Sequence, residues 1–215
     1  MYIIDESYLT RELSIPNINE TLSDAKEILR GFVDDKVRLL LQNALGYQLF
    51  KEFDGYIDAN GNLQVSAPQK WKNLVNGVEY TKSGKTYKWN GLIYTQGSFK
   101  KSLLADFVYC EWLDWQETVV TGTGEKVLKA TNATDASSNY RKVNIWNRFL
   151  AQYQGAEMLG DYPIMGRKHG AYYMDWIGSG VNSGYVPLIT FLLHNATDYP
   201  NIAGKRYKIK NYLGL

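Results

Sequence analysis

The sequence contains few of the residues that build the common enzyme and metal sites. Its 215 residues include one cysteine and two histidines. The lone cysteine, Cys110, excludes an internal disulfide, and its place in an apolar run predicts a buried small side chain rather than a nucleophile. His169 and His194 have no acids or cysteines around them at ligand spacing, so we expect neither a zinc site nor a histidine-based catalytic triad.

Long hydrophobic runs and a large net charge are also missing. No run approaches the ~18 consecutive apolar residues of a membrane-spanning helix, so no membrane partner is predicted. The first four residues are followed at once by Asp5 and Glu6, which is unlike a signal peptide. The net charge of +2 argues against a protein that binds nucleic acid through its overall charge.

Two glycine-rich loops and one acidic loop lack the spacing of known ligand motifs. The loops at Gly122–Gly124 and Gly178–Gly184 have no strand–helix context and no Walker lysine, so no nucleotide site is predicted. The segment Asp58–Asn62 resembles a calcium loop only superficially, because its spacing is wrong and no glutamate follows where one is needed. We therefore expect no cofactor, no metal and no catalytic residue, and the chain is not predicted to be an enzyme.

Charge is unevenly distributed along the chain. Residues 1–60 hold 11 acidic and 6 basic residues, a net charge of −5, and the remainder holds 18 basic and 11 acidic residues, a net charge of +7. The last fifteen residues contain no acid and four bases, Lys205, Arg206, Lys208 and Lys210. This pattern fits a solvated basic tail, and it equally fits a chain whose oppositely charged ends favour head-to-tail assembly.

Hydrophobic residues make up 45% of the chain and aromatic residues 14%. This composition predicts a mainly α, α+β fold with one sizeable core. A short helix is predicted from Pro68 to Gly77. Two alternating runs, Val78–Lys82 and Lys85–Trp89, flank a Gly-containing turn and predict a β-hairpin. Apolar residues at helical spacing then predict a long central helix from Leu103 to about Glu117.

Helical periodicity recurs on both sides of this block. We expect a helix from near Asn19 or Thr21 to Gly31 and a separate one over Phe32–Leu45. Further helices are predicted at three places, Tyr47–Phe53, about Ser138–Met158 and Pro187–His194. The polar stretch Thr121–Asn139 is predicted as a loop with a short strand at Lys126–Leu128. The organisation is one helical domain, residues 1–198, with a hairpin insertion at about 78–97 and a C-terminal arm, residues 199–215.

Two alternative functions come from side-chain patterns. Glu111 and Asp114 lie on neighbouring turns of the central helix, as the paired carboxylates of a glycoside hydrolase could, although a solvated helix face explains them more simply. Aromatic and lysine side chains alternate on the predicted hairpin and could stack on single-stranded nucleic acid, although lysines also keep an exposed ribbon soluble. Because of the second pattern, a DNA-binding module that handles packaged DNA is the alternative function.

Several aromatic and glycine motifs resemble those of head–tail connector (adaptor or neck-ring) proteins of tailed bacteriophages, including crAss-like phages. The resemblance covers about residues 30–150. It consists of these segments, in chain order: Leu45–Phe53, Trp71–Tyr80, Trp89–Leu92, Phe107–Tyr109, Thr121–Glu125 and Trp146–Asn147.

The resemblance implies a structural virion protein, made in the host cytoplasm, with a helical-bundle core, an inserted β-hairpin and an extended C-terminal arm. It implies a homo-oligomeric ring of about twelve subunits that joins the portal protein to downstream tail or neck rings. DNA would pass through the channel without sequence-specific contact. The arm would dock into the portal, with Lys205, Arg206, Lys208 and Lys210 steering it and with Tyr212, Leu213 and Leu215 making the buried contacts.

Overall fold

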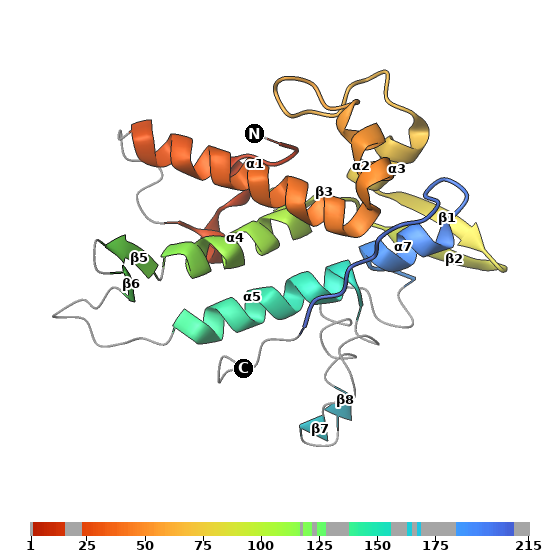
Figure 1. Ribbon diagram of the computed structural model, residues 1–215. Helices are drawn as coiled ribbons and strands as arrows, with labels where there is room; N and C mark the ends of the chain where they lie inside the picture. The colour runs from red at the N-terminus through yellow and green to blue at the C-terminus, as the bar shows by residue number, and fades with distance from the viewer. Residues whose placement is uncertain are drawn as a thin grey trace.

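Three long helices form the centre of the molecule, which is an α+β protein. The computed structural model describes residues 2–15, 23–116, 118–121, 124–127, 138–155, 163–164, 167–168 and 184–208. Helix α4 (Leu103–Gln116) packs against both α1 (Ser23–Leu45) and α5 (Ser138–Tyr153), and it lies between them in Figure 1. The N-terminal residues form two short 3₁₀ turns, η1 (Glu6–Tyr8) and η2 (Arg11–Leu13), and η2 contacts α4.

The first long helix runs without a break, so the prediction of two helices separated at Gly31 is wrong. Leu29, Val33 and Val37 are fully buried, so the apolar face continues through the glycine at helical spacing. A glycine inside a helix costs only about 1 kcal/mol relative to alanine, and the contacts of this buried face outweigh that cost. The predicted end of the helix at Gly46 is confirmed, and its φ of +82° is a conformation that favours glycine.

Two short helices follow, α2 (Tyr47–Asp54) and α3 (Gln69–Asn76), and both confirm the prediction. Helix α3 ends at Gly77, whose φ is +85°. A Cβ atom added at Gly77 would come within 2.5 Å of the Trp89 carbonyl oxygen, and one at Gly91 would come equally close to the Val75 carbonyl oxygen. Two backbone segments therefore pass each other here at a distance that only glycine permits.

The inserted β-structure is larger than predicted. Strands β1 (Val78–Lys82) and β2 (Lys85–Trp89) form the expected antiparallel hairpin. A second antiparallel hairpin, β3 (Ile93–Gln96) and β4 (Phe99–Ser102), extends the insertion to the start of α4 and was not predicted. The region predicted as a loop with one short strand contains a pair, β5 (Thr118–Thr121) with β6 (Gly124–Val127). A further short pair is β7 (Pro163–Ile164) with β8 (Arg167–Lys168).

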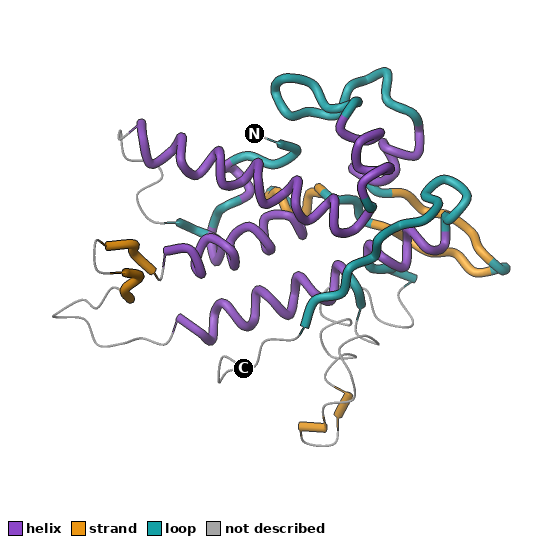
Figure 2. Tube along the Cα trace, in the orientation of Figure 1, coloured by secondary structure: helices purple, strands orange, loops and turns teal. Residues whose placement is uncertain are grey.

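The β1–β2 hairpin lies against the last helix, α7 (Leu188–His194), at one end of the molecule (Figure 2). Trp89 stacks on Phe191 with ring centroids 5.6 Å apart, and Tyr80 contacts the same ring edge-on. The buried Trp89 indole donates a hydrogen bond to the Leu74 carbonyl, so α3, the hairpin and α7 form one packed unit. Within the described residues, no helix is both long enough and apolar enough to cross a membrane.

Candidate functional site

The predicted C-terminal arm begins as part of the body. We call residues 199–208 the C-terminal strap. Tyr199 is 2% exposed, and its ring lies 5.7 Å from that of Trp71 and 5.5 Å from that of Phe191. The backbone amides of Gly204 and Lys205 donate to carbonyl oxygens at the C-terminal end of α1, at 2.9 and 3.0 Å.

The strap then crosses to α5, where Tyr207 closes an inner aromatic cluster. The cluster consists of Phe107, Trp146, Phe149, Tyr153 and Tyr207, and the ring of Tyr207 lies 5.3–5.9 Å from each of the other four. Gln154 holds the Tyr207 backbone on both sides, donating to its carbonyl and accepting from its amide at 2.9 Å. The Trp146 indole donates to the Lys208 carbonyl at 2.9 Å. The chain is therefore fixed to the body as far as residue 208.

The residues predicted to dock fall into two groups. Lys205, Arg206 and Lys208 lie on the strap and are exposed, and none of them forms a salt bridge with a carboxylate in the described part of the chain. The other four predicted docking residues, Lys210, Tyr212, Leu213 and Leu215, lie outside the described residues. Docking into another protein stays a prediction for both groups.

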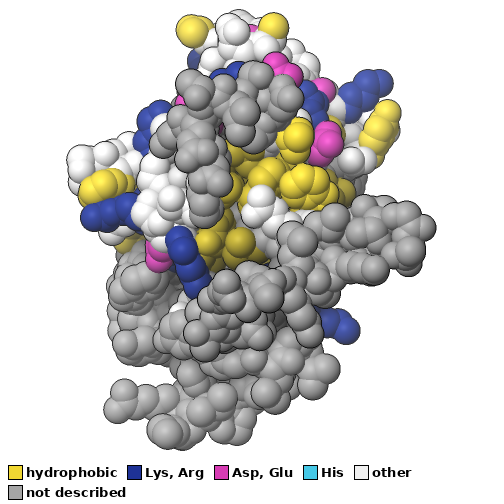
Figure 3. All heavy atoms as spheres, turned by 90° about the vertical axis from the view of Figure 1, so that its left-hand side faces the viewer, with side chains coloured by type: hydrophobic (Ala, Val, Ile, Leu, Met, Phe, Trp, Pro, Cys, Tyr) yellow, Lys and Arg dark blue, Asp and Glu magenta, His cyan; other side chains and the backbone are white. Residues whose placement is uncertain are grey.

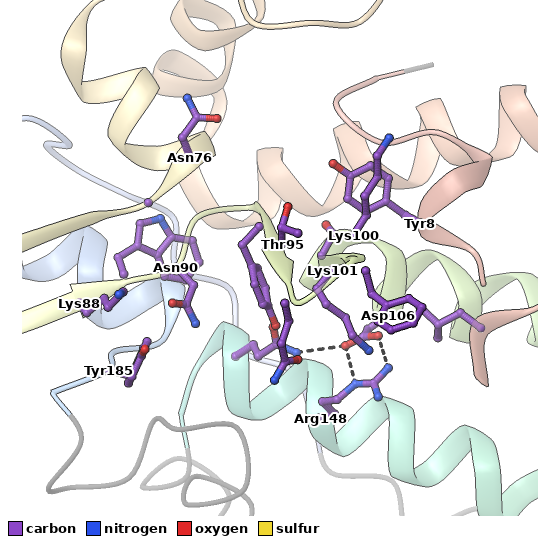
Figure 4. Close-up of a pocket in the computed structure, with 18 of the residues that line it drawn as sticks. Tyr8, Asn76, Lys88, Asn90, Thr95, Lys100, Lys101, Asp106, Arg148 and Tyr185 are labelled. Atoms are coloured by element: carbon purple, nitrogen blue, oxygen red, sulfur yellow. Dashed lines mark hydrogen bonds and ion pairs between the residues drawn. The ribbon is translucent and has the colours of Figure 1, made fainter. Parts of the chain in front are cut away.

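A polar cleft of about 1140 Å³ opens between the two hairpins and the N-terminal segment (Figure 4). Lys88 and Tyr185 lie at one end of the cleft, while Lys100 and Tyr8 lie at the other. The cations on its walls, Lys100 among them, already have contacts within the chain. Lys88 pairs with Glu79 at 3.2 Å, Lys101 lies 3.9 Å from Glu12, and the Arg11 guanidinium lies 3.8 Å from the Phe99 ring centroid.

The floor of the cleft is a buried ion pair between α4 and α5. Asp106 is 3% exposed and Arg148 is 8% exposed, and the Arg148 guanidinium donates to both carboxylate oxygens, its Nε at 2.9 Å from Oδ2. The same guanidinium also pairs with Glu12. Gln152 donates to Asp106 Oδ2 at 3.1 Å. Burial raises the pKa of the Asp106 carboxyl, whereas the charge and bidentate donation of Arg148 favour its ionised form.

This floor holds elements together rather than presenting reactive groups. Both Asp106 oxygens accept hydrogen bonds from neighbouring side chains, and Arg148 divides its donors between two carboxylates. Sequence reasoning missed the pair because its members are 42 residues apart. The available signal was a single acid, Asp106, inside the otherwise apolar run from Leu103 to Cys110.

The two carboxylates considered as an acid pair each bind a lysine. Glu111 accepts from Lys36 of α1 at 2.8 Å, and Asp114 pairs with Lys142 of α5. These contacts tie α4 to both of its neighbours, which is a structural use of the two side chains.

The aromatic side chains of the β1–β2 hairpin face the body. Tyr80 stacks on Tyr87 at 5.7 Å, both rings contact His194, and the Tyr80 hydroxyl lies 2.9 Å from His194 Nδ1. Burial lowers the pKa of His194, and the nearby Lys82 lowers it further. These rings are therefore occupied by contacts within the chain. His169 lies outside the described residues, and in the remainder no group of His, Cys, Asp and Glu side chains is arranged to hold a metal ion.

Comparison with models of protein families, with curated proteins and with solved structures finds no match to this chain.

Proposed function

We propose that this chain is a structural subunit of a tailed-phage virion, a head–tail connector or neck-ring protein that joins the portal to the tail around the DNA channel. The observation that carries the proposal is the C-terminal strap. It is hydrogen-bonded to the body through residue 208 and leaves Lys205, Arg206 and Lys208 exposed. A fixed body whose basic end is directed outward suits a subunit that docks onto neighbouring subunits of an assembly.

The arrangement of the helices supports the same proposal. The packed helices α1, α4 and α5 would be the bundle core of the subunit, with the hairpin insertion on one side of it. Residues 209–215 would be the docking arm, shorter than the sequence predicted, because residues 199–208 are part of the body. In this proposal the arm binds the portal, and DNA passes the ring without sequence-specific contact.

A pair of truncations tests the docking arm. Removing residues 209–215 should leave the melting temperature of the purified subunit unchanged and abolish its incorporation into particles. Removing residues 201–215 should also lower the stability of the body, because it deletes Tyr207 and the strap hydrogen bonds. The readouts are thermal unfolding of the purified chains and the protein content of particles from a phage complemented with each variant.

Deleting the whole gene supplies the control for the wider proposal. Particles without the protein should be DNA-filled heads that lack tails, since the joint between portal and tail is missing. If the deletion gives tailed particles, the connector proposal is wrong. If the deletion gives tailless heads while the chain lacking residues 209–215 is incorporated normally, the connector role stands and the docking arm is wrong.

A further inference from the structure

The outer face of α1 carries apolar side chains that the body leaves uncovered. Ile28 is 52% exposed and Leu39 is 44% exposed. Together with Gly31 and Asp35 they recur at i, i+3, i+7 and i+11, so the four residues share one face of the helix, which we call the α1 stripe. The two apolar side chains lie about three turns apart, so they indicate an interface only together with the aromatic patch beside them.

No contact among the described residues requires the glycine of the stripe. A Cβ atom added at Gly31 would meet none of the described atoms within 4 Å, and the residue lies in the interior of a regular helix. Alanine would therefore fit and would favour the helix more strongly. A glycine at this position instead permits the backbone of another chain to approach closely.

An aromatic patch adjoins the stripe where α4 ends. Phe32 of α1 lies 5.1 Å from Trp112 and 5.8 Å from Trp115, measured between ring centroids. Trp115 is 51% exposed, and the buried Trp112 Nε1 has no hydrogen-bond acceptor among the residues that the structure describes. Figure 3 views this end of the molecule and shows hydrophobic side chains open to solvent in the middle of the face. Tryptophan is enriched among the residues that contribute most of the binding energy at protein interfaces.

The charges around the stripe are unbalanced. Four cations of α1 are all paired within the chain, Lys26 and Arg30 with Glu6, Lys36 with Glu111, and Arg38 with Asp54. Glu27 and Asp35, by contrast, are exposed and form no salt bridge with any described residue. The stripe therefore presents an apolar surface with negative charge, which suits a partner with cations and few acids.

The C-terminal strap has that composition. In its own subunit it meets α1 at Asn43, about 12 Å along the helix from Asp35 and about 6 Å from Leu39 at the near end of the stripe, and then turns away to α5. We infer that the α1 stripe binds the strap of a second copy of this chain, with Lys205, Arg206 and Lys208 facing Glu27 and Asp35. This contact joins two different surfaces, so it can repeat from copy to copy around a ring, and it rests on the proposed connector function.

Charge reversal on each surface tests the contact. One variant carries Glu27→Lys with Asp35→Lys, and the other carries Lys205→Glu with Arg206→Glu and Lys208→Glu. Each should weaken self-association of the full chain about tenfold or more. Mixing the two variants should restore association to near the wild-type value, because each reversed surface then meets its complement. Association is measured by sedimentation velocity over a range of protein concentrations, at low and at high salt.

Two matched controls separate this contact from general effects. Lys51→Glu with Lys85→Glu changes exposed lysines elsewhere and should leave association unchanged apart from a small effect of net charge. Ile28→Ser should weaken association, whereas Leu193→Ser, at a residue of equal exposure on α7, should not. Thermal unfolding should show that every variant keeps a folded body.

The outcomes also distinguish this inference from the connector proposal. A wild-type chain that stays monomeric, a reversed surface without effect, or a mixture that fails to recover would each overturn the inference. If the stripe variants self-associate normally but fail to enter particles, another virion protein occupies the stripe, and the inference is again wrong. If the mixture recovers while the protein is absent from virions, the contact between copies stands and the connector proposal fails.

Discussion

Two of the aromatic clusters lie against α4, and they differ in whether their polar atoms have hydrogen-bond partners. In the inner cluster, the indole of Trp146 and the hydroxyl of Tyr153 donate to backbone carbonyls of the strap, at 2.9 and 3.0 Å. The second cluster is the aromatic patch of Phe32, Trp112 and Trp115, which we call the outer patch. Here Trp115 is half exposed, and the indole nitrogen of Trp112 has no acceptor within the described residues.

The half exposure of Trp115 indicates separate roles for similar residues. A buried polar group that lacks a partner costs about 1–3 kcal/mol, and the indole nitrogens of Trp112 and of the fully buried Trp71 both carry this cost, so the missing acceptor alone does not mark an interface. The outer patch is costlier for the isolated subunit and offers rings to a partner.

The largest expected effect comes from the centre of the inner cluster. Phe149 is fully buried and contacts four other rings, so Phe149→Ala should lower the free energy of unfolding by about 3–5 kcal/mol. Trp115→Ala in the outer patch should cost less than about 1–2 kcal/mol, since half of that side chain is already exposed. Denaturant unfolding followed by circular dichroism compares the two, and equal losses would contradict the assignment of separate roles.

The buried ion pair should come next. Arg148→Ala leaves the Asp106 carboxylate without its main partner, and the expected loss is about 3 kcal/mol at neutral pH. Burial raises the pKa of Asp106, and removing Arg148 removes the charge that opposes this rise. The folded variant then binds a proton more readily than the unfolded chain does. Its free energy of unfolding should therefore fall as pH rises, and its loss of stability relative to the wild type should shrink in acid.

Unfolding of Arg148→Ala at a series of pH values checks this prediction. The control is Lys36→Ala, which removes the half-exposed pair with Glu111 and should cost no more than about 1 kcal/mol. A deficit that is the same at all pH values would mean that Asp106 is not the group responsible.

A smaller effect is expected where the strap closes the inner cluster. Tyr207→Ala should cost about 2 kcal/mol, because its ring is only partly buried. Tyr207→Phe keeps the ring and loses only the hydroxyl that accepts from Asn43, so its cost should be about 1 kcal/mol or less. If neither variant changes the midpoint of thermal unfolding, the strap does not stabilise the body.

The smallest effect concerns alkaline pH. Burial, helped by the nearby negative charge of Asp106, raises the pKa of Tyr94 to about 12. The neutral phenol is the form that the folded state favours, so its contribution is complete below the unfolded value of about 10 and is lost as pH rises toward 12. Tyr94→Phe should lose less stability than the wild type across this window, as unfolding at pH 9 and about 11 would show.

Local patterns predicted the elements that local residues determine. The β1–β2 hairpin followed from Ser83–Gly84 between two alternating strands, and the turn adopts positive φ at both residues. The second hairpin has a weaker signal, because Gly97 is its one turn residue of that kind and β4 contains two lysines. The break predicted at Gly31 failed because buried residues on both sides outweigh the glycine.

Contacts between distant residues could not be predicted in this way. The pairing of Asp106 with Arg148 and the closure of the inner cluster by Tyr207 depend on which helices meet. The sequence predicted a basic end with apolar anchors, and of these Tyr207 lies within the described residues and packs on the body. The sequence did not indicate that Tyr207 uses its ring on the body while the neighbouring cations face solvent.

The most direct test of the connector proposal is the copy number of this chain in purified virions, measured by quantitative mass spectrometry. A closed ring fixes the stoichiometry, so about a dozen copies per particle are expected. Hundreds of copies would instead indicate a capsid or decoration protein. Absence from the particle would contradict the structural role altogether.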